Sequence, residues 1–454
     1  MVVIGLEIHV QLKTKSKLFC KCSATYRDVE QNSNICPICT SQPGSKPMAI
    51  TRRALENLLK IGLALNCKIK IDERIYIQRK HYFYPDLPSN YQRTSLPIAY
   101  DGMVSNIRIR ELHIEEDPGR YELRKGLVDY NRSGVPLVEI VTDPDLRSPE
   151  EARMFLEELQ AITGYLDATR EEPGSMRIDA NISLEGGNRV EVKNINSYKG
   201  VYTALKYEII RQGNLVQKGL KVEQETRHFD EAQGITLGSR KKESVADYRY
   251  IPDPDLPPIL VTESLVTGIR NTIPELPRDK ARRLVKQFRI KEEDAWILVS
   301  EKEVADLFEE LAKEIDPQAC ASWLRGPLKK QLNYRNLLLK DSGLSKQHIK
   351  ELIQMYVKNE ITDKIADELL ISLFKESKSP RKMAEELGLK TISNVNEIEE
   401  IVKKIIKESP KAVEDYSNGE EKALHFLSGK VMKETKGRAS PEIVRDLLKK
   451  LVGK

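Results

Sequence analysis

Four cysteines near the N-terminus have the spacing of a metal site; they are Cys20, Cys22, Cys36 and Cys39. Thiolates are ligands that tetrahedral Zn²⁺ prefers, and the 13 residues between the two pairs are enough for the loop to return. The alternative is free or disulfide-bonded cysteines, but only Cys67 and Cys320 lie outside the cluster, which is typical of a reduced, cytosolic protein. The sequence therefore predicts a structural zinc site that staples a loop and does not catalyse.

Polar side chains share one face of three predicted strands. Because side chains alternate along a strand, Glu7 and His9 face away from the apolar residues around them. The same alternation places Asp179 opposite the apolar residues of the next such strand, and Lys193 with Glu191 on the third. A solvated sheet face would explain each strand singly, but three such faces in one domain indicate a functional surface.

A second group of acidic residues consists of Glu115, Glu116 and Glu139, the last of which interrupts an otherwise apolar strand. Carboxylates with a histidine suit Mg²⁺, whose coordination is usually completed by waters and substrate phosphates. This indicates nucleotide chemistry, although the chain has neither a P-loop motif nor a Gly-x-Gly-x-x-Gly motif, so an ATP site must be built differently. His113 either joins this site or bonds a backbone carbonyl.

Aromatic side chains alternate with bases and amides in 80–86 and 90–93. Such combinations often grip nucleotides or single-stranded RNA ends, whereas a packed aromatic loop would need no ligand. Segments 239–244 and 247–252 hold a similar basic and aromatic cluster, for which an ordinary exposed loop is the alternative. These patterns leave both interpretations open.

The elements that must position these residues fall into three predicted parts, and the fold class is α+β. Residues 1–262 alternate strands and turns with a few inserted helices, which predicts a mixed-sheet catalytic domain carrying the zinc-stapled loop. Residues 263–395 and 396–454 show apolar residues at three- and four-residue spacings. This pattern predicts an all-α helical domain followed by a small helical tail domain.

Local signals place several helix ends. Ser148 and Glu151 form a capping-box pattern ahead of an apolar stripe, which predicts a helix over 149–164. Another helix is expected over 54–65. The expected breaks between short helices in the C-terminal half are Gly326-Pro327, Gly343, Ser379-Pro380 and Ser409-Pro410.

Charge and hydropathy narrow the possible partners. The net charge of +5, from 74 Lys and Arg against 69 Asp and Glu, is too small by itself to indicate nucleic-acid binding. Within 422–454, however, nine Lys and Arg against three Asp and Glu make a basic tail that suits a phosphate backbone. Glu7 and His9 interrupt any signal peptide and no apolar run could span a bilayer, so a cytoplasmic protein without a membrane partner is expected.

Several motifs together resemble the B subunit of the aspartyl/glutamyl-tRNA amidotransferases, the GatB family. These motifs are Gly5-Leu-Glu-Ile-His9, Cys36-Pro-Ile-Cys39, Tyr82-Phe-Tyr-Pro-Asp-Leu-Pro88, His113-Ile-Glu-Glu-Asp117, Gly134-Val-Pro-Leu-Val-Glu139, Met176-Arg-Ile-Asp179, Glu191-Val-Lys-Asn194, Asp247-Tyr-Arg-Tyr-Ile-Pro252 and Lys436-Gly-Arg-Ala-Ser-Pro441. The resemblance covers the full chain. The polar stretch 40–46 leans toward the archaeal branch, and the chain has no room for the inserted domain of the related archaeal GatE protein.

The resemblance implies a fold and a reaction. It implies a cradle-like catalytic domain, a helical domain and a tail domain that contacts tRNA, within a GatCAB heterotrimer whose other members are an amidase (GatA) and a small protein (GatC). The amidase would release ammonia from glutamine or asparagine and pass it through a channel. GatB would use ATP and Mg²⁺ to phosphorylate the side-chain carboxylate of misacylated Asp-tRNA(Asn) or Glu-tRNA(Gln), and ammonia would then displace phosphate to give Asn-tRNA(Asn) or Gln-tRNA(Gln).

The resemblance also implies roles for individual residues. The implied phosphorylation and metal-site residues are Glu7, His9, Glu116, Glu139 and Asp179, with His9, Glu116 and Glu139 as Mg²⁺ ligands. Lys193 is the candidate stabiliser of the transferred phosphate, and Asn194 and Ser197 resemble residues close to the reacting end. Strand alternation places Glu115 on the face of His113, so Glu115 and Glu116 stand as alternatives for cofactor binding.

Two other functions compete with this one. A non-catalytic tRNA-docking scaffold, whose carboxylates merely solvate a sheet, would tolerate Glu139→Ala and Asp179→Ala. An amidase acting alone is disfavoured, because the chain lacks a Gly/Ser-rich amidase stretch with a catalytic lysine and has no Cys–His pairing outside the zinc cluster. The sequence leaves open whether Asp-tRNA, Glu-tRNA or both are used.

Overall fold

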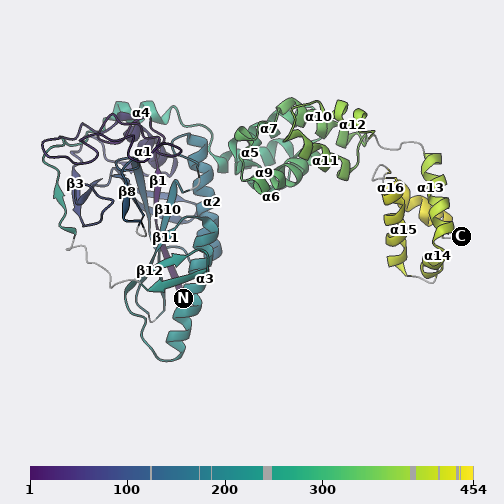
Figure 1. The fold of residues 1–454 in the computed structure, drawn as a ribbon, viewed down its shortest axis with the longest axis horizontal. Coiled ribbons are helices and arrows are strands. Elements are labelled where there is room, and N and C mark those ends of the chain that lie inside the picture. Colours follow the sequence, from purple (N-terminus) through teal and green to yellow (C-terminus); the bar gives the residue numbers. More distant parts are fainter. Residues whose placement is uncertain are drawn as a thin grey trace. The chain divides into compact units, whose positions relative to one another are not determined.

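The computed structural model describes residues 1–122, 125–172, 174–185, 187–238, 248–388, 395–417, 420–435, 439 and 441–452. It divides into two compact units, Met1–Pro277 and Arg278–Lys454 (Figure 1). The predicted basic loop 239–244, Asp247 and the tail residues Lys436, Arg438 and Lys454 lie outside the described residues. The division into three domains stays a prediction.

A 12-stranded mixed sheet forms the centre of the first unit. Its main path runs β13-β12-β11-β10-β1-β9-β6-β4-β3-β14, and β5 pairs with both β6 and β2. Strands β11 and β12 run parallel, whereas the other neighbours are antiparallel. The strands are β1 (Val2–Gln11), β2 (Lys68–Ile69), β3 (Ile77–His81), β4 (Tyr91–Ser95), β5 (Ala99–Val104), β6 (Ile107–Glu116), β9 (Pro136–Thr142), β10 (Met176–Leu184), β11 (Val190–Ile195), β12 (Glu225–Asp230), β13 (Ile235–Gly238) and β14 (Ile251–Pro252), with β7 (Arg120–Glu122) and β8 (Leu127–Asp129) as a separate hairpin.

The central strands have one apolar and one polar face, as the alternation predicts. On β1, Leu6, Ile8 and Val10 are at most 1% exposed, and they belong to one core with the apolar residues of β9 and β10. Helices pack their own apolar residues into this core and so cover the apolar face of the sheet (Figure 1). The helices of this unit are α1 (Arg52–Ala64), α2 (Pro149–Leu166), α3 (Tyr198–Gln217) and α4 (Glu263–Arg270). The polar side chains of the central strands lie on the opposite face of the sheet.

Helix α2 begins with the predicted N-cap, but the second hydrogen bond of the predicted capping box is made to another residue. The Ser148 hydroxyl accepts a hydrogen bond from the backbone N–H of Glu151 at 3.1 Å, as an N-cap should. The Glu151 carboxylate, however, accepts from the N–H of Arg147 at 2.7 Å instead of closing the box on Ser148. The helix runs past Gly164 and ends at Leu166, and the next residue, Asp167, caps it with a left-handed φ of 50°.

The second unit consists of helices among its described residues. They are α5 (Pro277–Phe288), α6 (Glu292–Val299), α7 (Lys302–Leu311), α8 (Pro317–Trp323), the π-helical turn η2 (Leu324–Leu328), α9 (Lys329–Arg335), the 3₁₀ turn η3 (Leu339–Asp341), α10 (Lys346–Val357), α11 (Asp363–Leu373), α12 (Pro380–Glu386), α13 (Val395–Glu408), α14 (Pro410–Ser417), α15 (Glu421–Glu434) and α16 (Pro441–Val452). With the sheet of the first unit, they confirm the predicted α+β class. No helix in the described ranges is long and apolar enough to cross a membrane.

One expected helix break is wrong. The Gly326-Pro327 pair predicts the end of a helix, but the chain continues from α8 through the π-turn Leu324–Leu328 into α9. A π-turn widens the helix by one residue, which accommodates a proline that lacks a hydrogen-bonding N–H. Ser379, by contrast, caps α12 as expected, with Pro380 at its first turn.

Candidate active site and zinc centre

Strand register assembles the polar face from segments far apart in the sequence. Glu7 of β1 lies opposite Asp179 of β10, and His9 of β1 lies opposite Glu139 of β9. On the far side of β9, His113 of β6 is also opposite Glu139. Residues directly opposite in antiparallel strands project from the same face, so four strands bring these side chains together.

His9, His113, Glu115 and Glu139 form what we call the histidine–carboxylate cluster. A Glu139 oxygen lies 2.5 Å from His113 Nε2 and 3.6 Å from His9 Nε2. The Glu115 carboxylate lies 3.6 Å from His9 Nε2 and 3.5 Å from His113 Nε2. One potential ligand atom each from His9, Glu115 and Glu139 lies within 4.8 Å of the others. The cluster is compact enough for one cation to contact all three.

Opposite charges stabilise each other in this cluster. Burial disfavours a charged His9, but Glu139 and Glu115 outweigh it and raise the pKa of His9 to about 9. Against the same burial, these two carboxylates raise the pKa of His113 to about 10. Burial also opposes the Glu139 carboxylate, yet His113 and His9 hold its pKa well below its usual range. Glu139 is therefore ionised at neutral pH, as a metal ligand must be, whereas the two histidines are protonated and His9 would release its proton when a cation binds.

The structure separates the two adjacent glutamates that the sequence left as alternatives. Glu115 joins the cluster, whereas the Glu116 carboxylate accepts from Arg93 Nη1 at 3.2 Å and from the Arg93 backbone N–H at 3.4 Å. The expected Mg²⁺ ligand Glu116 therefore does not lie with His9 and Glu139. The reason is the alternation of side chains along β6, a signal that was present in the sequence.

A neighbouring acidic cluster consists of Glu7, Asp179 and Glu191, whose potential ligand atoms lie within 4.8 Å of one another. Here Lys193 supplies the positive charge, because its Nζ lies 3.2 Å from Asp179 and 3.6 Å from Glu191. Burial and the neighbouring carboxylates raise the pKa of Glu7. The Asn181 amide donates to Glu7 at 3.0 Å. The predicted residues Glu7, Asp179 and Lys193 are thus brought together.

A β-bulge determines where Lys193 and Asn194 lie. Ile195 of β11 pairs with Ile178 of β10, but Val192 pairs with Ala180, so β11 has an extra residue at this point. Asn194 takes a left-handed φ of 66°, and its Nδ2 lies 3.0 Å from Nδ1 of His228. Alternation of side chains along the strand could not predict this bulge.

Ser197, predicted to lie near the reacting end, begins helix α3. Its hydroxyl accepts from the backbone N–H of Gly200 at 2.9 Å and donates to Glu231 at 2.9 Å. In this structure Ser197 therefore acts as the N-cap of α3, and both of its contacts are structural.

Lys80, the first residue of the segment 80–86 in which bases alternate with aromatics, also lies on the polar face. It pairs across β3 and β4 with Gln92, whose amide donates to Glu115 at 3.2 Å. Its Nζ lies 5.0 Å from the centre of the Tyr248 ring. Although burial opposes the charged form, Glu115 and Glu139 raise the pKa of Lys80. Alternation along 77–81 could have placed it on this face.

The histidine–carboxylate cluster fits a hard divalent cation. Two of its donors are carboxylates, and Mg²⁺ is usually bound by one or two carboxylates together with waters and substrate phosphates. Thr94 lies opposite Glu115, and its hydroxyl is buried without a hydrogen-bond partner within the part of the chain that the structure describes. An unsatisfied polar atom at this place is typical of a site completed by an ion and its waters.

A cavity of about 230 Å³ lies beside Glu7. Asn181 and Ser183 line it, as do the basic side chains of Arg110 and Arg189. The cavity therefore offers hydrogen-bonding groups and the basic residue Arg189 to a ligand, whereas Arg110 is paired with Asp143 at 3.0 Å.

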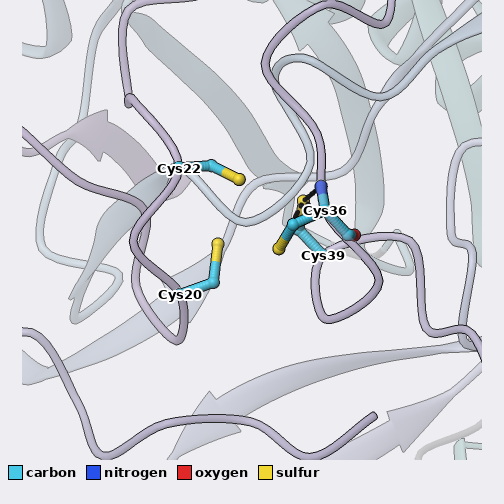
Figure 2. A group of neighbouring side chains, drawn as sticks. All are labelled: Cys20, Cys22, Cys36 and Cys39. Atoms are coloured by element: carbon cyan, nitrogen blue, oxygen red, sulfur yellow. Dashed lines mark hydrogen bonds between the residues drawn. The ribbon is translucent and has the colours of Figure 1, made fainter.

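The four predicted zinc ligands converge from two loops (Figure 2). Their sulfur atoms lie within 4.8 Å of one another, and the Sγ atoms of Cys36 and Cys39 are 3.8 Å apart. Zinc–sulfur bonds of about 2.3 Å at tetrahedral angles require sulfur atoms about 3.8 Å apart, so the donor set fits zinc. The backbone N–H of Cys36 donates to Cys39 Sγ at 3.2 Å, which stabilises the turn.

The two remaining cysteines have no feature of a nucleophile. Both Cys67 and Cys320 are buried. Burial, with a smaller contribution from Asp101, raises the pKa of Cys67 to about 12, and burial together with Asp316 does the same for Cys320. A thiol that stays protonated at neutral pH is a poor nucleophile.

Known proteins match the whole chain. A family model described as the GatB/GatE catalytic domain matches residues 2–267, and one described as the GatB domain matches residues 306–452. The chain is 52% identical over 448 residues to a protein of Methanothermobacter thermautotrophicus, covering 99% of each chain. It is 50% identical over 461 residues to one of Methanocaldococcus jannaschii, covering 99% of this chain and 98% of the relative. Both relatives are named as the B subunit of aspartyl/glutamyl-tRNA(Asn/Gln) amidotransferase.

Proposed function

This chain belongs to the GatB/GatE family, and we propose that it is the B subunit of a tRNA-dependent amidotransferase of the archaeal type. In this proposal it phosphorylates the side-chain carboxylate of misacylated Asp-tRNA(Asn), Glu-tRNA(Gln) or both. Ammonia from the amidase GatA then displaces phosphate, and the small protein GatC completes the heterotrimer. The relatives' names, which describe one part of a larger enzyme together with its tRNA substrates, support this proposal.

The observation that carries it is the charge pattern of the polar face. A histidine–carboxylate cluster suited to a divalent cation lies at the centre, with Lys80 among its neighbours on one side and Lys193 beside Asp179 on the other. Phosphoryl transfer is catalysed mainly by positioning and by positive charge around the phosphoryl oxygens. A solvated sheet face would not require the Lys193 ammonium to lie within 3.6 Å of both Asp179 and Glu191.

We assign roles from this geometry. His9, Glu115 and Glu139 would hold Mg²⁺, and Glu115 takes the place expected for Glu116. Mg²⁺ with ATP would supply the phosphoryl group and neutralise its oxygens. Asp179 and Glu191 keep the Lys193 ammonium charged and oriented toward the same face, where it can stabilise transferred phosphate.

Transfer of radiolabelled γ-phosphate tests the proposal. The complete heterotrimer is incubated with labelled ATP and either Asp-tRNA(Asn) or Glu-tRNA(Gln), with glutamine withheld so that the phosphorylated intermediate accumulates. We expect label on at least one aminoacyl-tRNA and its loss with Glu139→Gln, while tRNA binding persists. The tRNA that is labelled identifies the substrate.

The same experiment distinguishes the scaffold hypothesis. A non-catalytic docking protein would bind tRNA, would leave both aminoacyl-tRNAs unlabelled and would tolerate Glu139→Gln. That combination of results would refute the proposed phosphorylating role.

A further inference from the structure

A fully buried lysine lies against the cysteine cluster. Lys17 is 0% exposed. Its Nζ donates to the carbonyl oxygen of Tyr130 at 3.1 Å and to Cys39 Sγ at 3.5 Å. In the described part of the chain no carboxylate forms an ion pair with it. Cys39 Sγ, which is a thiolate when zinc is bound, is therefore the contacting group that can balance this ammonium.

The Lys17 ammonium and a zinc-bound cysteine cluster would each carry an unfavourable buried charge. A buried ammonium without a counter-charge is strongly disfavoured, because it has lost its hydration. A Zn²⁺ ion with four thiolates has the opposite excess, a net charge of 2−, in a loop where Cys20 is only 5% exposed. When the site is occupied, the Lys17 ammonium offsets one of the two negative charges and gains the counter-charge that it otherwise lacks.

The position of Lys17 joins the segments that form the site. Its backbone N–H donates to the carbonyl oxygen of Cys22 at 3.0 Å, while its side chain crosses to Cys39. The next residue, Leu18, donates to the carbonyl oxygen of Gly134 at 2.7 Å, just before strand β9 begins. The lysine thus contacts both cysteine loops and the segment that leads to Glu139.

We propose that Lys17 is the outer-sphere counter-charge of the zinc centre. Its ammonium holds Cys39 in ligand position and raises the affinity of the loop for zinc. The inference rests on the proposed zinc site and adds to it a determinant of metal affinity outside the four ligands. Such outer-shell partners commonly change metal affinity 10- to 100-fold.

Zinc affinity in the full-length chain tests this role. Lys17→Met removes the charge but keeps the length of the side chain, and Lys21→Met is the matched control because Lys21 lies between two ligands yet is exposed. In competition with a chromophoric chelator at fixed pH, we expect zinc to bind Lys17→Met about 10- to 100-fold more weakly. Lys21→Met should bind zinc as the unmodified chain does. Equal affinity of Lys17→Met and the unmodified chain would overturn the proposal.

Cobalt substitution separates this role from a purely structural one. A positive charge next to a thiolate stabilises the sulfur electrons, so its removal should move the thiolate-to-cobalt charge-transfer band to lower energy. An unchanged band in folded Lys17→Met would refute the inference. Should Lys17→Met not fold, Lys17→Gln replaces it, because an amide still donates to the Tyr130 carbonyl but carries no charge. The same shift and weakening are expected.

The zinc site itself is tested by the metal content of the unmodified chain. A chain without zinc refutes the site, whereas a zinc-loaded chain whose affinity is insensitive to Lys17 refutes only the role of this lysine. Neither result depends on amidotransferase activity.

Discussion

Glu115 and Glu116 are adjacent in strand β6 but have different partners. Glu115 contacts two histidines on the polar face, whereas Glu116 pairs with Arg93. The two share a side-chain type and are one residue apart, yet β6 directs them to opposite faces. The two side chains are chemically identical, so it is their surroundings that make Glu115 a potential metal ligand and Glu116 the partner of an arginine.

A pair of matched substitutions tests this difference. In the heterotrimer, Glu115→Gln should lower kcat for amidation by about 100-fold or more, because it removes a carboxylate ligand of the Mg²⁺ that would neutralise the phosphoryl oxygens. It should also raise the Mg²⁺ concentration needed for half-maximal rate. Glu116→Gln should keep the Mg²⁺ dependence of the native enzyme. A reversed pattern, with Glu116→Gln altering the Mg²⁺ response, would contradict the assigned ligand set.

At the scale of elements, a buried ion cluster attaches strand β14 to the sheet. Asp253, which follows β14, is buried and accepts from Arg79 at 3.0 Å and from Arg93 at 2.8 Å. Burial opposes the ionised form, but the hydrogen bonds from Arg79, from the Asp255 backbone N–H and from Arg93 lower the pKa of Asp253. This pairing joins 251–255 to β3 and β4, the strand pair that also carries Lys80.

Asp253→Asn should destabilise the first unit by about 3–5 kcal/mol, because it removes the buried anion that Arg79 and Arg93 share and leaves each arginine with one other carboxylate. The control Asp255→Asn removes a partly exposed partner of Arg79 and should cost less than about 1 kcal/mol. Denaturant unfolding monitored in the sheet domain measures both. Equal costs for the two substitutions would show that burial of the pair is not decisive.

The same cluster predicts a pH dependence. The folded-state pKa of Asp253 lies below its unfolded value of about 4. Its contribution to stability is therefore complete above pH of about 4 and is lost as the pH falls through the folded pKa. On acidification, the native chain should lose more unfolding free energy than Asp253→Asn, so the two stability curves should approach each other. Parallel curves would argue against this linkage.

At the scale of the whole molecule, the proposed chemistry and the basic tail belong to different compact units. All predicted catalytic and zinc-site residues lie in Met1–Pro277, whereas the exposed Lys449 and Lys450 lie on α16 of the second unit. A phosphate backbone is a fitting partner for such a surface. We therefore expect substitutions in the tail to affect tRNA affinity without changing the phosphorylating site.

The salt dependence of tRNA binding tests this expectation. The double substitution Lys449→Gln/Lys450→Gln should reduce the slope of log affinity against log salt by about one for each phosphate that is no longer neutralised. The rate of amidation at saturating tRNA should stay unchanged. Lys313→Gln, an exposed lysine of the same unit, is the control and should leave the slope as it is. A rate loss at saturating tRNA would place the tail in the reaction itself.

The sequence by itself determined the features that depend on short stretches of chain. Alternation indicated the polar faces of β1 and β10, the cysteine spacing indicated the sulfur cluster, and Ser148 indicated the start of α2. The strand faces and the helix start follow from backbone geometry over a few residues, and the sulfur cluster follows from the preference of zinc for four thiolates at this spacing.

Only the tertiary structure decided which of these features meet. The pairing of His9 with Glu139 and of Glu7 with Asp179 depends on the register of strands more than 100 residues apart, and the bulge before Ile195 depends on the partner strand. Lys17 gave no local sign of its role, because its contacts with Cys39 and Tyr130 arise from loop packing. Register, bulges and buried charge pairs are fixed by the packing of the whole sheet, and for that reason no local pattern could reveal them.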